Sequence, residues 1–189
     1  MPKKISYLLA LVLSIISCQK GDKEHDSFEI TSNRIGHLTN KVRLHQLDSV
    51  FANDSIVRKT ASNELLSATN EIEIYEKGGK KLLILEARSA TDSSSTIENI
   101  EVIDHRYKTP SGLTPDGTFK DIKEHYTISK INNTLSAAVI FVDSIQAYIT
   151  IDKKELPVAL RTDTDIKIEA TQIPDTAKIK HFLISWDED

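Results

Sequence analysis

Two short stretches of the chain repeat apolar residues at intervals of three and four, the spacing that lines one face of a helix. These residues are Leu44, Leu47 and Phe51 within residues 40–52, and Phe119, Ile122 and Tyr126 within residues 118–126. The second stretch also has a start signal, because Thr118 is followed three positions later by Asp121, a variant of the capping box. The pattern therefore predicts two short amphipathic helices.

Each predicted helix is followed by short runs of β-branched and apolar residues with turn residues between them. The runs are 71–75, 81–85 and 96–104 after the first helix, and 137–142, 145–151, 166–170 and 177–186 after the second. Gly78 and Gly79 mark a hairpin turn between the first two runs. Many strands and few helices predict the α+β class, with an antiparallel sheet and two short helices in one domain, 29–189.

The two helical segments align without gaps at an offset of 75 residues, which places Leu44 opposite Phe119. The dipeptides Leu38-Thr39 and Leu113-Thr114 match at the same offset. One interpretation is a tandem duplicated helix-plus-meander module, with halves 30–107 and 108–187. The other is convergence, since amphipathic helices share apolar spacing by chance. The predicted fold class is the same under both.

The start of the chain has the pattern of a targeting segment. Lys3 and Lys4 precede an apolar run over residues 5–17, and Cys18, the only cysteine, comes next. Such a run is shorter than the roughly 20 residues that span a bilayer. Residues 19–27 are charged and lack large apolar side chains until Phe28, which is typical of a solvated tether.

The run Ile15-Ile16-Ser17-Cys18 resembles the lipobox of bacterial lipoproteins. This resemblance implies a signal peptide over 1–17, cleavage between Ser17 and Cys18, and a lipid such as palmitate on Cys18. Residues 18–28 would then be the lipidated cysteine and a flexible tether, and the lipid would hold the protein to a membrane. The implied localisation is the bacterial cell envelope, most consistent with the outer membrane, at its periplasmic face or at the cell surface.

The charge composition narrows the kinds of partner to be expected. The chain has 24 Lys and Arg against 28 Asp and Glu, a net charge of −4, and no basic stripe. Nucleic-acid binding draws on released counterions around basic side chains, so no nucleic-acid partner is expected. With its only cysteine assigned to the lipid, the domain is expected to fold without a disulfide.

Two weaker resemblances extend into the folded part. Gly36 with Leu38-Thr39, and Gly112 with Leu113-Thr114, each lead into a predicted helix and meander, and resemble units of the β-lactamase-inhibitor protein and of the small lipoprotein of the barrel-assembly machinery. The stretch from Ile30 to Trp186 is similar to uncharacterised lipoproteins of Bacteroidota, above all at 112–126 and 151–157. These resemblances imply a fold and a place in the cell but no activity.

No catalytic, cofactor-binding or metal motif is found in the sequence. The six histidines lack the clustered spacing of zinc ligands, and neither Asp163-Thr164-Asp165 nor Asp116-Gly117-Thr118 completes a known site. Glu71 and Glu73 are expected on one exposed strand face. We therefore predict no cofactor and no metal. The six histidines are His25, His37, His45, His105, His125 and His181.

Three interpretations of the function stay open at this point. The first is a non-enzymatic domain that binds a protein or another envelope component through its sheet face or loops. Tyr75, Tyr107, Tyr148 and Trp186 are candidate anchors for such a partner, with core packing as the alternative role. The second is a hydrolase-type enzyme whose dispersed site lies around Asp104, His105 and Arg106. A purely structural envelope protein is a third interpretation.

Overall fold

The computed structural model describes residues 26–59, 71–89 and 91–186. Ser17, Cys18 and His25 lie outside the described residues, so the predicted cleavage site, lipid attachment and first histidine are not observed. Within the described parts, no helix is long and apolar enough to cross a membrane.

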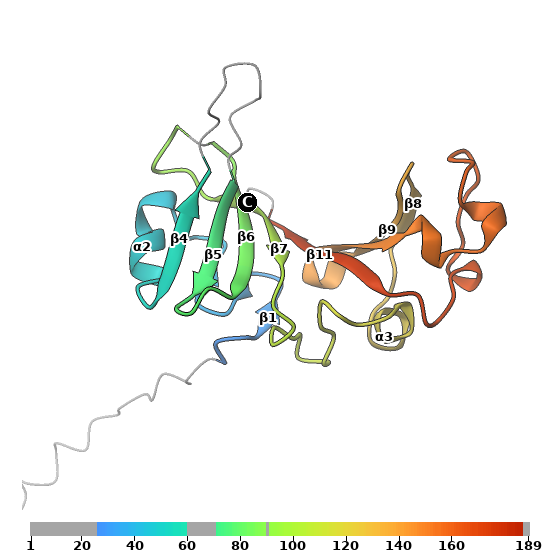
Figure 1. Ribbon diagram of the computed structural model, residues 1–189, viewed down its shortest axis with the longest axis horizontal. Coiled ribbons are helices and arrows are strands. Elements are labelled where there is room, and N and C mark those ends of the chain that lie inside the picture. The colour runs from blue at the N-terminus through green and yellow to red at the C-terminus, as the bar shows by residue number, and fades with distance from the viewer. Residues whose placement is uncertain (1–25, 60–70, 90, 187–189) are drawn as a thin grey trace, which may run out of the picture.

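The first half begins with a small three-stranded meander and continues through a short helix into four strands (Figure 1). The meander is β1 (Ile30–Thr31), β2 (Arg34–Ile35) and β3 (Leu38–Thr39). The 3-10 helix η2 (Leu44–Gln46) runs into α2 (Leu47–Val50). The four strands are β4 (Asp54–Arg58), β5 (Glu71–Glu76), β6 (Lys81–Ala87) and β7 (Ile97–Val102).

The second half repeats this order of a helix and four strands. Helix α3 (Phe119–His125) precedes β8 (Lys130–Asn133), β9 (Ala137–Val142), β10 (Ala147–Asp152) and β11 (Ile179–Ser185). The other helices among the described residues are single 3-10 turns in the connections: η3 (Asp143–Ile145), η4 (Lys153–Glu155), η5 (Val158–Leu160) and η6 (Ala170–Gln172).

The two halves share one antiparallel sheet of eight strands, in the order β4-β5-β6-β7-β11-β10-β9-β8. The last strand of each half, β7 and β11, pair with each other at the centre, where Ile100 lies opposite Ile184. The edges of the sheet are therefore β4 and β8, the first strand after the helix in each half (Figure 1).

Alternation along the strands gives the sheet an inward face and an outward face. The inward face is apolar across the junction between the halves, because Leu85, Ile100 and Ile184 are paired in register and fully buried. Phe119 and Ile122 of α3 are fully buried in the same core. We call the opposite face, which carries Glu73, Glu101 and Tyr148, the outward face.

The N-terminal meander is tied to the far end of the chain. The indole N–H of Trp186 donates to the carbonyl of Ser32 at 2.8 Å. Gly36 has a φ of +56°, and a Cβ at this position would lie 2.4 Å from the carbonyl oxygen of Ser27, so the close approach of the two backbones requires glycine. Phe28 packs edge-on against the buried Tyr107, with ring centroids 5.0 Å apart.

The structure confirms the α+β class and both predicted helices, of which the first is shorter than the periodic stretch suggested. The predicted strand at 166–170 is wrong. Those residues form a loop that ends in η6, and the side-chain amide of Asn133 donates to the carbonyl of Ile166 at 2.7 Å, a bond no sheet ladder supplies. Two edge strands, β4 and β8, were not predicted.

Candidate functional site

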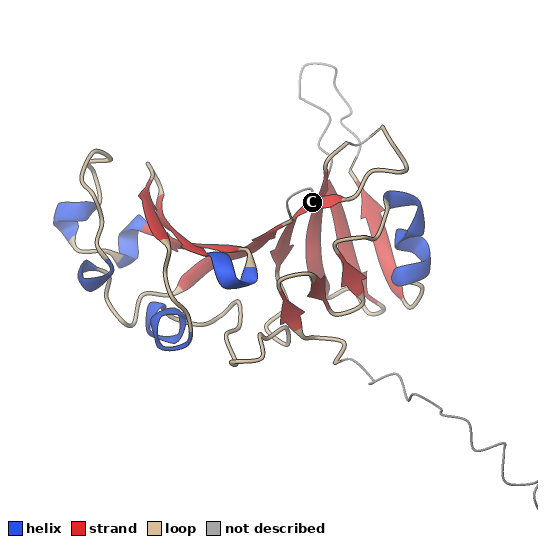
Figure 2. Ribbon diagram, turned by 180° about the vertical axis from the view of Figure 1, so that it is seen from behind, coloured by secondary structure: helices blue, strands red, loops and turns tan. Residues whose placement is uncertain are grey.

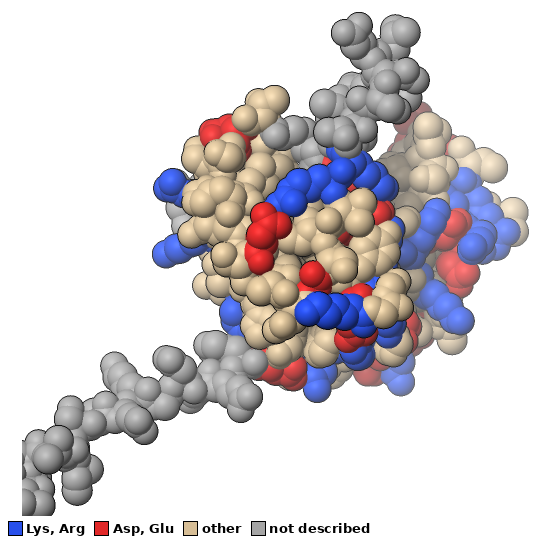
Figure 3. Space-filling view, turned by 60° about the vertical axis from the view of Figure 1, so that its left-hand side comes forward, with Lys and Arg blue, Asp and Glu red and all other residues tan. Residues whose placement is uncertain are grey.

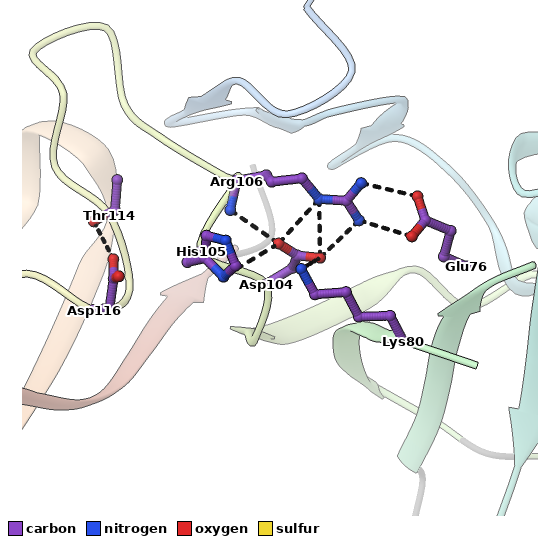
Figure 4. Close-up of polar contacts among 7 residues, drawn as sticks. All are labelled: Glu76, Lys80, Asp104, His105, Arg106, Thr114 and Asp116. Carbon is purple, nitrogen blue, oxygen red and sulfur yellow. Dashed lines mark hydrogen bonds and ion pairs between the residues drawn. The ribbon is translucent and has the colours of Figure 1, made fainter. Parts of the chain in front are cut away.

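Asp104, one of the three residues of the proposed enzymatic site, lies just after β7 in a cluster of ion pairs (Figure 4). Its carboxylate accepts bonds from the backbone N–H of Arg106 at 2.9 Å and from the guanidinium at 2.7 Å. Lys80, from the β5–β6 turn, adds its ammonium at 3.0 Å. Burial by itself raises the pKa of Asp104, but the hydrogen bonds from Arg106 and Lys80 outweigh it and hold that pKa well below its usual range.

Arg106 extends the cluster to a neighbouring strand. Its two terminal nitrogens donate to the carboxylate of Glu76, the last residue of β5, at 2.9 and 3.1 Å. The guanidinium also lies over the ring of Phe28, 4.3 Å from its centroid. Arg106 thereby joins the end of β5, the loop after β7 and the N-terminal segment.

This cluster lacks the properties of an acid–base site. A general acid or base works best with a pKa near the operating pH, whereas the partners of Asp104 keep it ionised. The side chain of His105 is 62% exposed, and its Nδ1 lies 3.9 Å from the carboxylate of Asp104, beyond hydrogen-bond distance. The arrangement is that of a structural ion-pair network.

The other histidines are dispersed over the described residues. His37 and His125 are exposed, and the latter is the last residue of α3. His45 contacts the carbonyl of Ser93 at 2.9 Å, and His181 contacts Glu101 at 2.6 Å. In the described ranges no three His, Cys, Asp or Glu residues are grouped as metal ligands.

Two acidic motifs have local structural roles. The carboxylate of Asp163 accepts from the backbone N–H of Asp165 at 2.9 Å, closing a turn in an exposed loop. Asp116 accepts from the hydroxyl of Thr114 at 2.6 Å, ahead of α3 (Figure 4). Asp121 accepts from the backbone N–H and the hydroxyl of Thr118 at 2.7 and 2.8 Å, which confirms the predicted helix start.

Glu71 and Glu73 do share one strand face, but the expectation that this face is exposed is wrong for Glu73. Only 5% of Glu73 is exposed. Its carboxylate is bonded by the ammonium of Lys81, by the hydroxyl of Tyr75 at 2.7 Å and by Lys59 at 3.0 Å. These bonds lower the pKa of Glu73 to about 2.

Positive and negative side chains largely balance each other at the end of the molecule that carries β4 and β5. Figure 3 shows Lys and Arg side chains interspersed with Asp and Glu side chains there, without a broad patch of one sign. Arg58 pairs with Asp48 at 3.2 Å and Lys59 with Glu71 at 2.6 Å.

The four candidate aromatic anchors separate into two groups. Tyr107 and Trp186 are buried in the core, 3% and 1% exposed. Tyr75 and Tyr148 lie on the outward face and are partly exposed. Tyr148 has a partner that the sequence analysis missed: Phe141, directly opposite on β9, whose ring stacks on it with centroids 6.4 Å apart.

This aromatic pair lies in a hollow of about 840 Å³ on the outward face of the second half, which we call the hollow. Its lining comes from β7 to β11 and the β9–β10 turn. The lining residues are Glu98, Asn99, Asn132, Val139, Phe141, Asp143, Gln146, Ala147, Tyr148, Thr150 and Ser185. In Figure 2 the second half of the sheet curves upward around this side, while α3 lies below it.

The hollow is acidic and rich in hydrogen-bonding groups. Glu98 and Asp143 line it, and no Lys, Arg or His is among its lining residues. Burial first, and then the negative charges of Glu86, Glu101 and Glu98, raise the pKa of Tyr148. The volume is within the usual range for ligand pockets.

The comparisons with known proteins bear on the fold. No protein family and no curated protein matches the sequence. Among solved structures, the uncharacterized protein yfeY from Escherichia coli is similar, with a TM-score of 0.52 and 14% identity over 84% of this chain and 99% of that chain. At this identity the likeness concerns architecture alone.

Proposed function

We propose that this protein is a lipid-anchored envelope lipoprotein whose folded part is a non-enzymatic binding domain. Its membrane attachment is the lipid on Cys18, and its partner is an envelope protein that docks on the outward face of the second half. The sequence of residues 1–18 supports the anchor, and the geometry of the hollow supports the binding role.

One observation carries the binding role: an exposed hollow floored by stacked aromatic rings on a rigid sheet. Aromatic side chains in concave, partly desolvated surroundings are the usual anchors of protein interfaces. Tyr148 and Phe141 are held there by regular pairing of β9 and β10, with Phe141 opposite Tyr148 and Ile140 opposite Ile149. The surface therefore needs little reorganisation to bind.

The enzymatic alternative gains no support from the residues first suggested for it. Asp104 is paired with Arg106 and Lys80, and the exposed His105 lies 3.9 Å from it, beyond hydrogen-bond distance. The arrangement of Asp104, Arg106 and Glu76 is sufficient to explain why these residues lie together.

A photo-cross-linking experiment in the native envelope tests the binding role. A photoreactive phenylalanine replaces Tyr148, and a matched variant carries it at Val158, which is 74% exposed and outside the hollow. We expect a discrete protein adduct from position 148 that is absent from position 158. No adduct at 148, or the same adducts from both positions, would contradict the proposal.

The lipid anchor has its own test. The wild-type protein should incorporate labelled palmitate and sediment with membranes, whereas the Cys18→Ala variant should be unlabelled and remain unprocessed. Equal labelling of the two proteins would refute lipidation at Cys18, whatever the cross-linking shows.

We further propose that the two halves descend from a tandem duplication. The shared order of one helix and four antiparallel strands supports this, as does the offset of 75 residues between the helices. The offset is not constant, since Glu71 and Ala137 begin equivalent strands only 66 residues apart. The longer link after β4 in the first half accounts for the change.

A further inference from the structure

The chemistry of the hollow selects for one kind of side chain in a partner. The two charged residues that line the hollow, Glu98 and Asp143, are both acids, and 43% of the Glu98 side chain is exposed. Two more acids, Glu86 and Glu101, are near enough to influence the ionisation of Tyr148. An anionic group would meet repulsion here, while a cation would be attracted.

The basic groups around the hollow do not neutralise it completely. Arg88 lies 3.5 Å from Glu98, His181 2.6 Å from Glu101, and Lys130 5.8 Å from the ring centroid of Phe141. The last contact indicates that the ring of Phe141 accepts a cation on its face. Tyr148, stacked beside it, offers a second aromatic surface of the same kind.

A further polar group lies at the base of the hollow. The hydroxyl of Thr150 is buried and has no hydrogen-bond partner among the described residues. A buried hydroxyl without a partner is unfavourable, and because Thr150 lines the hollow, a ligand bound there can supply the missing hydrogen bond. A ligand that donates several N–H groups suits this arrangement.

We propose that the hollow binds an Arg or Lys side chain presented by the protein partner, between the carboxylates of Glu98 and Asp143 and the rings of Tyr148 and Phe141. This inference rests on the proposed function and specifies the chemistry of the same site. Arginine fits best, because its planar guanidinium stacks on aromatic rings and donates five hydrogen bonds.

The test uses the purified full-length protein and backbone amide NMR. The probe is a capped pentapeptide with arginine between two pairs of glycines, and the matched probe carries citrulline, which is similar in shape but uncharged. We expect the arginine peptide to shift the amides of Val139, Tyr148 and Thr150, with a dissociation constant on the order of 1 mM. The citrulline peptide should bind at least about threefold more weakly.

Three variants make the result specific. Glu98→Gln should weaken binding of the arginine peptide about threefold to fivefold. Glu124→Gln, on the exposed surface of α3, should leave that binding unchanged. Lys130→Met removes the cation already near Phe141 and should leave binding unchanged or tighten it.

Equal shifts with arginine and citrulline, tighter binding of a glutamate peptide, or shifts produced instead by a neutral oligosaccharide would overturn the inference. The two proposals fail separately. Cross-links at position 148 without arginine binding would preserve a partner but reject its cationic contact. Arginine binding without cross-links would preserve the cation site but reject an envelope partner.

Discussion

At the scale of single residues, the structure gives buried charges a role that the sequence does not reveal. In the sequence, nothing distinguishes Asp104 and Glu73 from other acidic residues near a strand. In the structure, each is almost fully buried and bonded to two or three partners. Some of those partners are distant in sequence: Lys80 lies 24 positions from Asp104, and Lys59 lies 14 positions from Glu73. A pattern of neighbouring residues cannot indicate such pairs, whereas it did indicate the local bond between Thr118 and Asp121.

Asp104→Asn should make the pH dependence of stability less steep. The folded-state pKa of Asp104 is depressed below the unfolded value of about 4. The ionised carboxylate therefore stabilises the fold at neutral pH, and this contribution is lost as the pH falls below about 4. We expect the variant to lose about 2 kcal/mol at pH 7 and progressively less at lower pH. Urea unfolding between pH 7 and pH 2 measures both effects.

Asp116→Asn is the matched control, because Asp116 is exposed and bonds only a neighbouring hydroxyl. Its free energy of unfolding should stay within about 0.5 kcal/mol of the wild type across the range. A pH profile of Asp104→Asn parallel to that of the wild type would show that the ion pairs do not stabilise the fold as described.

At the scale of elements, the sequence predicts best where one face of an element is strongly apolar. Helix α3 and strands β5, β6, β9 and β11 meet that condition. The edge strands do not: β4 has no fully buried residue, and β8 reads Lys-Ile-Asn-Asn. The stretch 166–170 alternates like a strand, but only Ile168 within it is buried, and the backbone around it makes other bonds.

Phe119→Ala tests whether α3 is part of the common core. Phe119 is fully buried at the start of the helix, so its removal leaves a cavity. We expect the free energy of unfolding to fall by about 3–5 kcal/mol. Lys120→Ala, one position along the helix and exposed, should cost less than about 0.5 kcal/mol. Equal losses in chemical denaturation would remove α3 from the core.

At the scale of the whole molecule, the pairing of β7 with β11 joins two similar halves into one sheet. The apolar runs of the sequence predict strands, but which strands become neighbours depends on the match of Ile100 with Ile184 and on packing across the inward face. The same pairing builds the hollow from five strands. Tyr148 already pointed there as a candidate anchor, and Phe141 is the signal that was missed, because an aromatic residue on the second face of β9 is unusual for a solvated surface.

We propose that, in the native envelope, a partner covers the outward face of the second half. Hydroxyl-radical footprinting of intact envelopes and of the purified full-length protein, read by mass spectrometry, measures this directly. We predict that oxidation of Phe141 and Tyr148 slows severalfold in the envelope, while oxidation of the exposed His125 on α3 is unchanged. Equal oxidation of the two rings in both preparations would contradict the claim.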